Sequence, residues 1–195
     1  MEFSTLLLGA VVVALVVWII FGGKLKVSPK GIEVDTEGLL KYLREAEAQK
    51  GLAPEGNVTE LEKVSAQVKA ISQRLPVGTV LWIDDHPLNN QKEKMALAQL
   101  GLFADSYTTN AEALAALKTG DYDIVISDIG READETGWDL LRDVHRLYPK
   151  VPFIFYTMNI TDRARKEATD AGARGIVERP GELITLVVNN LRPRR

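Results

Sequence analysis

The feature that most constrains the fold is an alternation of short apolar runs with amphipathic stretches, which begins near Thr79. The apolar runs predict five strands, at Val80–Asp84, Phe103–Tyr107, Tyr122–Ser127, Phe153–Thr157 and Gly175–Val177. Helical periodicity follows each strand, over residues 89–100, 110–119, 137–148, 161–172 and 181–191. Five such βα units predict an α/β fold with a doubly wound parallel sheet.

Two of the runs, Ile124–Ile126 and Phe153–Phe155, are apolar at every position. Strands that helices cover on both faces have this pattern, whereas half-exposed strands alternate apolar and polar residues. In a doubly wound sheet the ligand site lies beyond the carboxyl ends of the strands, where the strand order reverses. The residues that end each strand are therefore the candidate functional residues.

Acidic and polar residues stand at these strand ends. Asp84 and Asp85 end the first strand, Asp128 follows the third, Thr157 ends the fourth, and Arg179 follows the fifth. Three carboxylates in one pocket repel one another unless a cation or protons intervene, and Mg²⁺ is the usual hard cation for such oxygens beside a phosphoryl group. Thr157 and Arg179 are then expected to contact the phosphoryl oxygens. A strand edge that is acidic without any functional reason explains one such residue taken alone. It does not explain why four strand ends carry residues that fit the same chemistry.

Three segments resemble the signatures of response-regulator receiver domains, which act in two-component systems: Val80–Pro87, Tyr122–Asp128 and Phe153–Thr157. The resemblance covers about residues 79–191 and implies a flavodoxin-like receiver with strand order 2-1-3-4-5. By this resemblance, Asp128 is the phosphoacceptor and Thr157 is the switch hydroxyl.

The resemblance also implies the ligands and the partners. Mg²⁺ is expected on the carboxylates of Asp84, Asp85 and Asp128 and on the backbone carbonyl of Gly130. A histidine kinase or a phosphotransfer protein is expected to supply the phosphoryl group, and the domain is expected to signal by protein contact. The implied chemistry is self-phosphorylation and dephosphorylation at Asp128, so the chain is not expected to be an enzyme acting on other substrates.

Three features depart from the family pattern, and one of them is the segment after Asp128, which lacks the usual Met-Pro and runs about one residue longer before Gly137. Arg179 stands where the family has a lysine before proline, and Met158 stands where a small residue usually follows Thr157. The guanidinium of arginine binds both oxygens of a carboxylate at once. Two roles of Arg179 therefore stay open: it contacts a phosphoryl group, or it forms a permanent ion pair with Asp128. These departures motivate an alternative, a non-phosphorylated pseudo-receiver that acts as a protein-interaction module. A magnesium phosphohydrolase is disfavoured, because Gly130 stands where its acid–base group is needed.

The N-terminus carries an uncharged, strongly apolar segment, Phe3–Gly23. As a helix it spans roughly 31 Å, which matches the hydrocarbon thickness of a bilayer. The segment lacks the polar stripe of a core helix and the positive start of a signal peptide, so residues 1–23 are predicted to be an uncleaved single-pass anchor. Lys24, Lys26 and Lys30 follow the segment, and this asymmetry predicts that the receiver lies in the cytoplasm.

Residues 24–78 are predicted to connect the anchor to a receiver domain at residues 79–195. Two short alternating segments flank a turn, a helix follows over Thr36–Lys50, and a second helix covers residues 57–75. The second helix carries a heptad seam, Leu61, Val64, Val68, Ile71 and Leu75. Two interpretations stay open: a stalk that forms a parallel homodimer, or an amphipathic helix packed on the receiver or on the preceding helix.

The composition excludes several classes of function. The chain has no cysteine and only two histidines, which excludes disulfides and thiolate metal sites and disfavours a zinc site built on imidazoles. Its net charge of -3 is a poor match for a nucleic-acid-binding protein, so no nucleic-acid partner is expected.

Overall fold

The computed structural model describes residues 26–28, 31–52, 58–71, 77–130 and 136–191. Its centre is a five-stranded parallel sheet with the order β4-β3-β5-β6-β7, which is the predicted order 2-1-3-4-5. The strands are β3 (Gly78–Ile83), β4 (Leu102–Tyr107), β5 (Ile124–Ser127), β6 (Phe153–Tyr156) and β7 (Gly175–Val177). All five predicted strands are confirmed.

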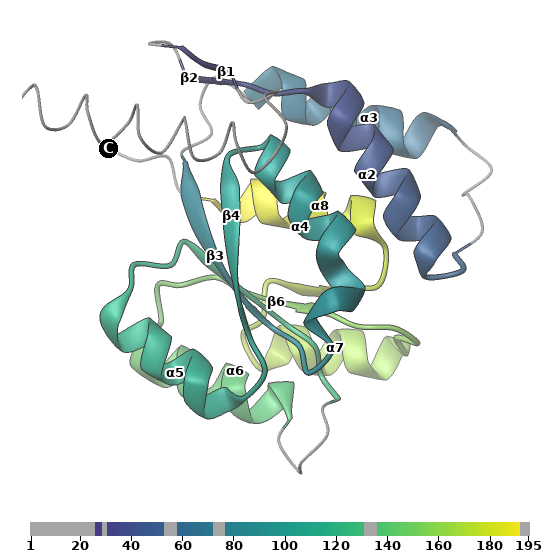
Figure 1. The fold of residues 1–195 in the computed structure, drawn as a ribbon. Coiled ribbons are helices and arrows are strands. Elements are labelled where there is room, and N and C mark those ends of the chain that lie inside the picture. Colours follow the sequence, from purple (N-terminus) through teal and green to yellow (C-terminus); the bar gives the residue numbers. More distant parts are fainter. Residues whose placement is uncertain (1–25, 29–30, 53–57, 72–76, 131–135, 192–195) are drawn as a thin grey trace, which may run out of the picture.

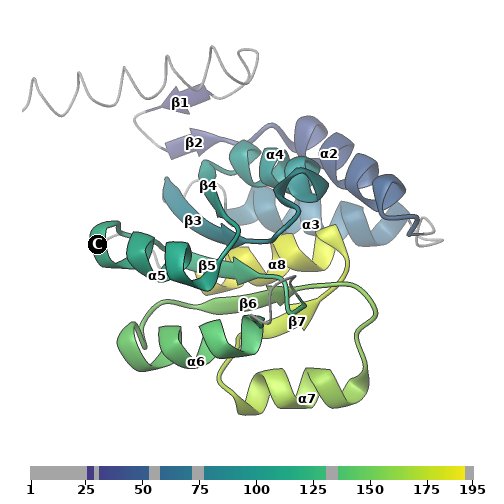
Figure 2. The same ribbon diagram turned by 60° about the horizontal axis from the view of Figure 1, so that its bottom comes forward.

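Helices cover both faces of this sheet, as the continuous apolar runs predict (Figures 1 and 2). One face carries α4 (Gln91–Gln99) and α8 (Pro180–Asn190), and the short η2 (Pro87–Asn90) leads into α4. The opposite face carries α5 (Asn110–Thr119), α6 (Gly137–Leu147) and α7 (Asp162–Asp170). Side chains alternate between two buried clusters: Trp82 packs with the α4 and α8 side, and Leu81 packs with the other.

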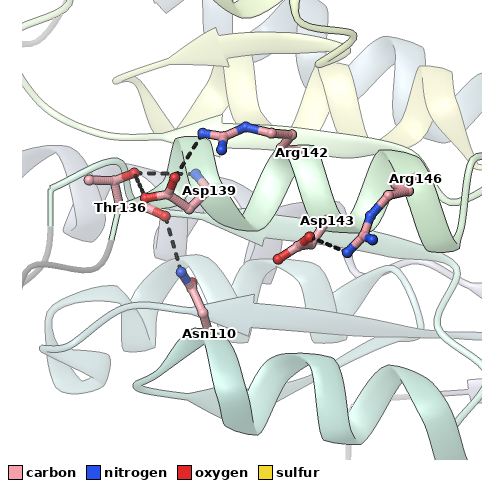
Figure 3. Close-up of polar contacts among 6 residues, drawn as sticks. All are labelled: Asn110, Thr136, Asp139, Arg142, Asp143 and Arg146. Atoms are coloured by element: carbon pink, nitrogen blue, oxygen red, sulfur yellow. Dashed lines mark hydrogen bonds and ion pairs between the residues drawn. The ribbon is translucent and has the colours of Figure 1, made fainter.

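Local side-chain chemistry fixes where the helices begin. Thr109 and Glu112 form a capping box at the start of α5. Thr136 caps α6, because its hydroxyl accepts the Asp139 N–H at 3.2 Å, and the Asn110 side chain donates to the Thr136 carbonyl at 3.3 Å (Figure 3). These contacts tie the starts of α5 and α6 together close to the carboxyl ends of the strands.

The connector forms the elements that its pattern predicts. The strands β1 (Lys26–Ser28) and β2 (Gly31–Glu33) pair in antiparallel fashion. Two helices follow, α2 (Thr36–Gln49) and α3 (Val58–Ile71), and we call this pair the helical hairpin. Figures 1 and 2 show the hairpin as a further layer outside α4 and α8, with α2 against α4 and α3 against α8.

The heptad seam of α3 faces the receiver over Leu61–Ile71, whereas Leu75 lies outside the described residues. Val64 and Val68 are 5% and 1% exposed, and they share one buried cluster with Leu183 and Val187 of α8. A β-carbon at Gly181 of α8 would lie only 3.2 Å from the Leu61 side chain, which shows how closely the two helices approach. The structure therefore supports the interpretation of an amphipathic helix packed on the receiver. The homodimer predicted through this helix gains no support, since its apolar face is already covered.

The predicted anchor over residues 1–23 lies outside the described residues. Among the helices that the structure does describe, none is both long and apolar enough to cross a bilayer.

Candidate functional site

Backbone hydrogen bonds bring the predicted strand-end residues to one edge of the sheet. The Asp128 N–H donates to the Ile83 carbonyl at 3.0 Å, just beyond the pairing of β3 with β5. The Thr157 N–H donates to the Val177 carbonyl at 3.1 Å, beyond the pairing of β6 with β7. Because β3, β5 and β6 are neighbours, Asp84, Asp128 and Thr157 end adjacent strands.

These ends line a cavity of about 300 Å³. Of the predicted site residues, the cavity wall contains Asp84, Asp85, Asp128, Gly130 and Thr157. Met158 also lines it and is 40% exposed, as expected for a residue at the entrance. The convergence predicted for the three carboxylates and the hydroxyl is therefore present, whereas Arg179 is not among the described residues that line the cavity.

The environment of Asp128 opposes its charge. Partial burial raises the pKa of this carboxyl above its ordinary value, and the neighbouring carboxylates of Asp84 and Asp85 raise it further. Hydrogen bonds from the Thr157 hydroxyl and from the Ile129 N–H, the latter at 2.7 Å, act in the opposite direction. Asp128 is thus a half-buried carboxyl whose ionised form is destabilised by burial and by two other acids.

The acidic pair that follows β3 is held in place by hydrogen bonds. The Asp84 carboxylate accepts the His86 N–H at 2.7 Å and the Asn90 side-chain amide at 2.5 Å. The imidazole of His86 lies 3.2 Å from the Asp85 carboxylate. Ligand atoms of Asp84, Asp85 and His86 all lie within 4.8 Å of one another, a group that does not include Asp128. The sequence did not single out His86 as a site residue, although it directly follows the acidic pair.

The donor set fits a hard divalent cation. The carboxylates of Asp84 and Asp85 raise the pKa of Asp128, so positive charge among them relieves an unfavourable interaction. Carboxylate oxygens and the Gly130 backbone carbonyl are the ligand types that Mg²⁺ prefers. Receiver domains typically bind Mg²⁺ at such a cluster.

The phosphoacceptor candidate is packed against the first residue of α6. The Gly137 N–H donates to the Ile129 carbonyl at 2.8 Å. A β-carbon at Gly137 would lie 2.3 Å from the Asp128 carbonyl oxygen and 2.9 Å from the Phe155 ring. Only glycine permits this close approach of α6 to the end of β5.

Arg179 contacts the helical hairpin. Its guanidinium lies 4.0 Å from the carboxylate of Glu47 on α2, and its side chain is 22% exposed. The expectation that Arg179 contacts phosphoryl oxygens stays a prediction. A different cation, Lys50 at the end of α2, lines the cavity beside the acids. No local sequence signal indicated Lys50, because its position depends on how α2 packs against α4.

Comparisons with known proteins agree with this geometry. A family model of the response regulator receiver domain matches residues 80–189. The aerobic respiration control sensor protein ArcB of Escherichia coli strain K12 is 32% identical over 109 residues, which are 54% of this chain and 14% of that protein. ArcB of Shigella flexneri matches to the same extent. The chain therefore spans only a small part of the curated relatives that it matches.

Solved structures share the fold at lower identity. The chemotaxis response regulator CheY4 of Vibrio cholerae is 23% identical with a TM-score of 0.53, over 60% of this chain and 100% of that one. The response regulator TrrA of Thermotoga maritima, solved in complex with Mg²⁺-BeF, is 24% identical with a TM-score of 0.52, over 58% and 99%. The family model covers more than half of the chain, and its match begins inside β3 and ends inside α8. The chain belongs to the response regulator receiver domain family.

Proposed function

We propose that this chain accepts a phosphoryl group on Asp128 from a histidine kinase or a phosphotransfer protein and signals the resulting state by protein contact. The observation that carries the proposal is the cavity at the strand ends, which joins Asp128 to Thr157 and to the acidic pair Asp84 and Asp85. Receiver domains generally act as signalling modules of two-component systems, and the carboxylates and the hydroxyl that line this cavity support phosphoryl acceptance.

The transfer follows from the groups in the cavity. An oxygen of the Asp128 carboxylate attacks the phosphorus of a phosphohistidine; the P–N bond breaks, its electron pair stays on the imidazole, and an acyl phosphate forms on Asp128. The Thr157 hydroxyl lies in the same cavity wall as Asp128 and lowers the pKa of its carboxyl, so it is placed to donate to a phosphoryl oxygen. Attack of water on the acyl phosphate returns Asp128 and inorganic phosphate.

The proposed ligands of Mg²⁺ are Asp84, Asp85, Asp128 and the Gly130 carbonyl. When bound, the ion supplies positive charge that neutralises the phosphoryl group during transfer. The protein's own contribution is orientation. Asn90 and the His86 backbone hold the Asp84 carboxylate at the cavity wall through the two hydrogen bonds described above.

Intact mass spectrometry tests the proposal directly. The full chain is incubated with acetyl phosphate and Mg²⁺, with Asp128→Asn as the test variant and Asp143→Asn, an acid on the outer side of α6, as the matched control. We expect a phosphoryl adduct in the wild type and in Asp143→Asn, and none in Asp128→Asn or after chelation of Mg²⁺. Absence of an Asp128-dependent adduct would refute phosphoryl acceptance.

The alternative is a pseudo-receiver that binds partners without being phosphorylated. Two observations favour it: Arg179 lies beside Glu47 rather than in the cavity wall, and Met158 lines the cavity at a position where the family usually has a small residue. Such a module would bind its partner equally well as wild type and as Asp128→Asn. Partner binding that changes with Asp128→Asn supports the phosphorylated receiver instead.

Membrane tethering is a separate part of the proposal. It rests on the uncharged segment Phe3–Gly23 and on the lysines that follow it. Expressed in Escherichia coli, the full chain is expected in the membrane fraction, protected from protease added to spheroplasts. Deletion of residues 3–23 is expected to release it. A full chain that stays in the soluble fraction would contradict the anchor.

A further inference from the structure

The helical hairpin places the positively charged side chain of Lys50 in the wall of the acidic cavity. Lys50 is the C-cap residue of α2, and its backbone N–H closes the helix on the Ala46 carbonyl at 3.1 Å. From this position its side chain, only 13% exposed, reaches the cavity wall that contains Asp84 and Asp128. Lys50 lies outside the part of the chain that matches the receiver family, which begins at residue 80.

The Lys50 ammonium is held by groups at the start of α4. It donates to the Asn90 side-chain oxygen at 3.0 Å and lies 3.3 Å from the carboxylate of Glu93, which is fully buried. Its nitrogen is also 5.0 Å from the centre of the Tyr156 ring, and the Tyr156 hydroxyl donates to Glu93 at 2.7 Å. An ammonium has three N–H donors, of which one donates to Asn90, while the contact with Glu93 is an ion pair.

The balance of charge around the cavity makes Lys50 distinctive. Among the described residues of the cavity wall, Lys50 is the only lysine or arginine, facing the carboxylates of Asp84, Asp85 and Asp128. Arg179, which the sequence suggested for this role, lies against Glu47 of α2. A phosphoryl group on Asp128 would add negative charge to this cavity, where Lys50 of the hairpin is the lysine that the described lining residues provide.

We propose that Lys50 binds the phosphoryl group that Asp128 accepts, an inference that rests on the proposed function. Its ammonium donates to a phosphoryl oxygen while Asn90 keeps it at the cavity wall, and the contact with Glu93 is given up or shared. Because Lys50 is the last residue of the α2 turn, the phosphorylated state is then bonded directly to the hairpin. The connector is thus part of the phosphoryl site as well as a spacer.

The experiment uses beryllofluoride, a phosphoryl mimic, with Mg²⁺ and the full chain. Binding is measured by tryptophan fluorescence in the wild type and in Lys50→Met, which replaces the ammonium by an unbranched apolar side chain. The matched control is Lys92→Gln, since Lys92 also joins α4 to α2, through Glu45 at 2.5 Å, but does not line the cavity. Mg²⁺ affinity is titrated separately for each protein.

Loss of one charge-assisted contact is expected to weaken beryllofluoride binding in Lys50→Met by roughly tenfold, with Mg²⁺ affinity unchanged or higher. Lys92→Gln is expected to resemble the wild type in both titrations. If Lys50 only supported the structure, it would act through Asn90, which holds the Asp84 carboxylate. Lys50→Met would then lose Mg²⁺ affinity together with beryllofluoride affinity. That parallel loss, or unchanged beryllofluoride binding in Lys50→Met, would overturn the inference.

Two further measurements keep the outcomes distinct. Lys50→Arg retains the charge and is expected to bind beryllofluoride more tightly than Lys50→Met; equal weakening in both variants counts against a role of the charge. In the wild type, amine labelling followed by mass spectrometry is expected to show lower reactivity of Lys50, but not of Lys92, when Mg²⁺ and beryllofluoride are added. A wild type that binds no beryllofluoride contradicts the proposed function itself, whereas normal wild-type binding with no effect of Lys50 contradicts only this inference.

Discussion

The two faces of the sheet differ in what lies beyond their helices. The face with α4 and α8 is covered again by the helical hairpin, whereas the face with α5, α6 and α7 has no such second layer in the described residues (Figures 1 and 2). On the covered face, Glu93 is fully buried and contacts Lys50 from one element and Tyr156 from another. Charged and polar side chains on this face therefore link separate elements, here α4 with the end of α2 and with β6.

On the open face, ion pairs run along single helices. Arg142 contacts Asp139 at 2.8 Å and Arg146 contacts Asp143 at 2.7 Å, each three residues apart on α6 (Figure 3). Exposed pairs of this kind are screened by solvent and fix no arrangement between elements. The difference teaches that the proposed phosphoryl site has unequal neighbours. On the open side α6 makes a backbone contact, and on the covered side the hairpin supplies a long, charged side chain.

The largest expected effect comes from a cavity made under the hairpin. Leu43 of α2 is fully buried in the cluster that joins the hairpin to the receiver, so Leu43→Ala is expected to lower the unfolding free energy by about 2–5 kcal/mol. The matched control is Leu147→Ala on the open face, where the side chain is 52% exposed and a change within about 0.5 kcal/mol is expected. Urea denaturation measures both. Similar losses in the two variants would show that the hairpin is not part of the folded core.

The second effect compares two glycines at the starts of helices. At Gly137, an added methyl group meets the Asp128 carbonyl, a backbone atom that cannot move cheaply, so Gly137→Ala is expected to lower stability by about 1–3 kcal/mol and to slow phosphorylation. At Gly181, the nearest atom is a methyl group of Leu61 on α3, which can turn aside. Gly181→Ala is expected to be nearly neutral, because helix propensity offsets the contact. Melting curves and the acetyl phosphate assay check both, and equal losses would contradict the assignment of a rigid contact at Gly137.

The third effect is a gain of stability. The pKa of Asp128 is raised in the folded protein by burial and then by Asp84 and Asp85, so the folded state binds this proton more tightly than the unfolded state. Ionised Asp128 therefore destabilises the fold at pH 7, and this penalty disappears as the pH falls through the raised pKa towards 3.8.

Asp128→Asn removes that charge. We expect the melting temperature at pH 7 and without Mg²⁺ to rise by roughly 1–3 °C, a value kept small because solvent screens a half-buried carboxylate. The gain is expected to vanish near pH 4 and to shrink when Mg²⁺ stabilises the wild type. A variant that melts lower than the wild type at pH 7 would contradict the repulsion among the three acids.

Much of this arrangement can be predicted from the sequence, because it depends on local patterns and on parallel-strand geometry. The apolar runs place β3 and β5, and strand adjacency alone brings Asp84 and Asp128 to one edge. Thr109 and Glu112 mark the start of α5 through chemistry confined to four residues.

The rest depends on contacts between distant elements. Heptad spacing at Val64 and Val68 identifies an apolar face but not what covers it, so self-association and packing on the receiver fit the pattern equally well. Lys50 contacts Asn90 and Glu93 only because α2 packs against α4, some 40 positions away in sequence. Lysines at the ends of amphipathic helices are common, so the sequence alone does not mark Lys50 as a site residue. The contact of Arg179 with Glu47 of α2 likewise joins distant elements.

The smallest expected effect is on the open face. Arg163 contacts Glu167 at 2.7 Å, four residues along α7, and the Arg163 side chain is 86% exposed. Because water and salt screen such a pair, Arg163→Gln is expected to shift the melting temperature by less than about 1 °C, and 0.5 M NaCl is expected to erase even that difference. Lys50→Met removes a cation of the same charge from the covered face, where Glu93 would be left buried beside a neutral side chain, so a clearly larger shift that persists in salt is expected there. If the two variants behaved alike, the hairpin would be no more than a solvated appendage, and the contrast between the faces would fail.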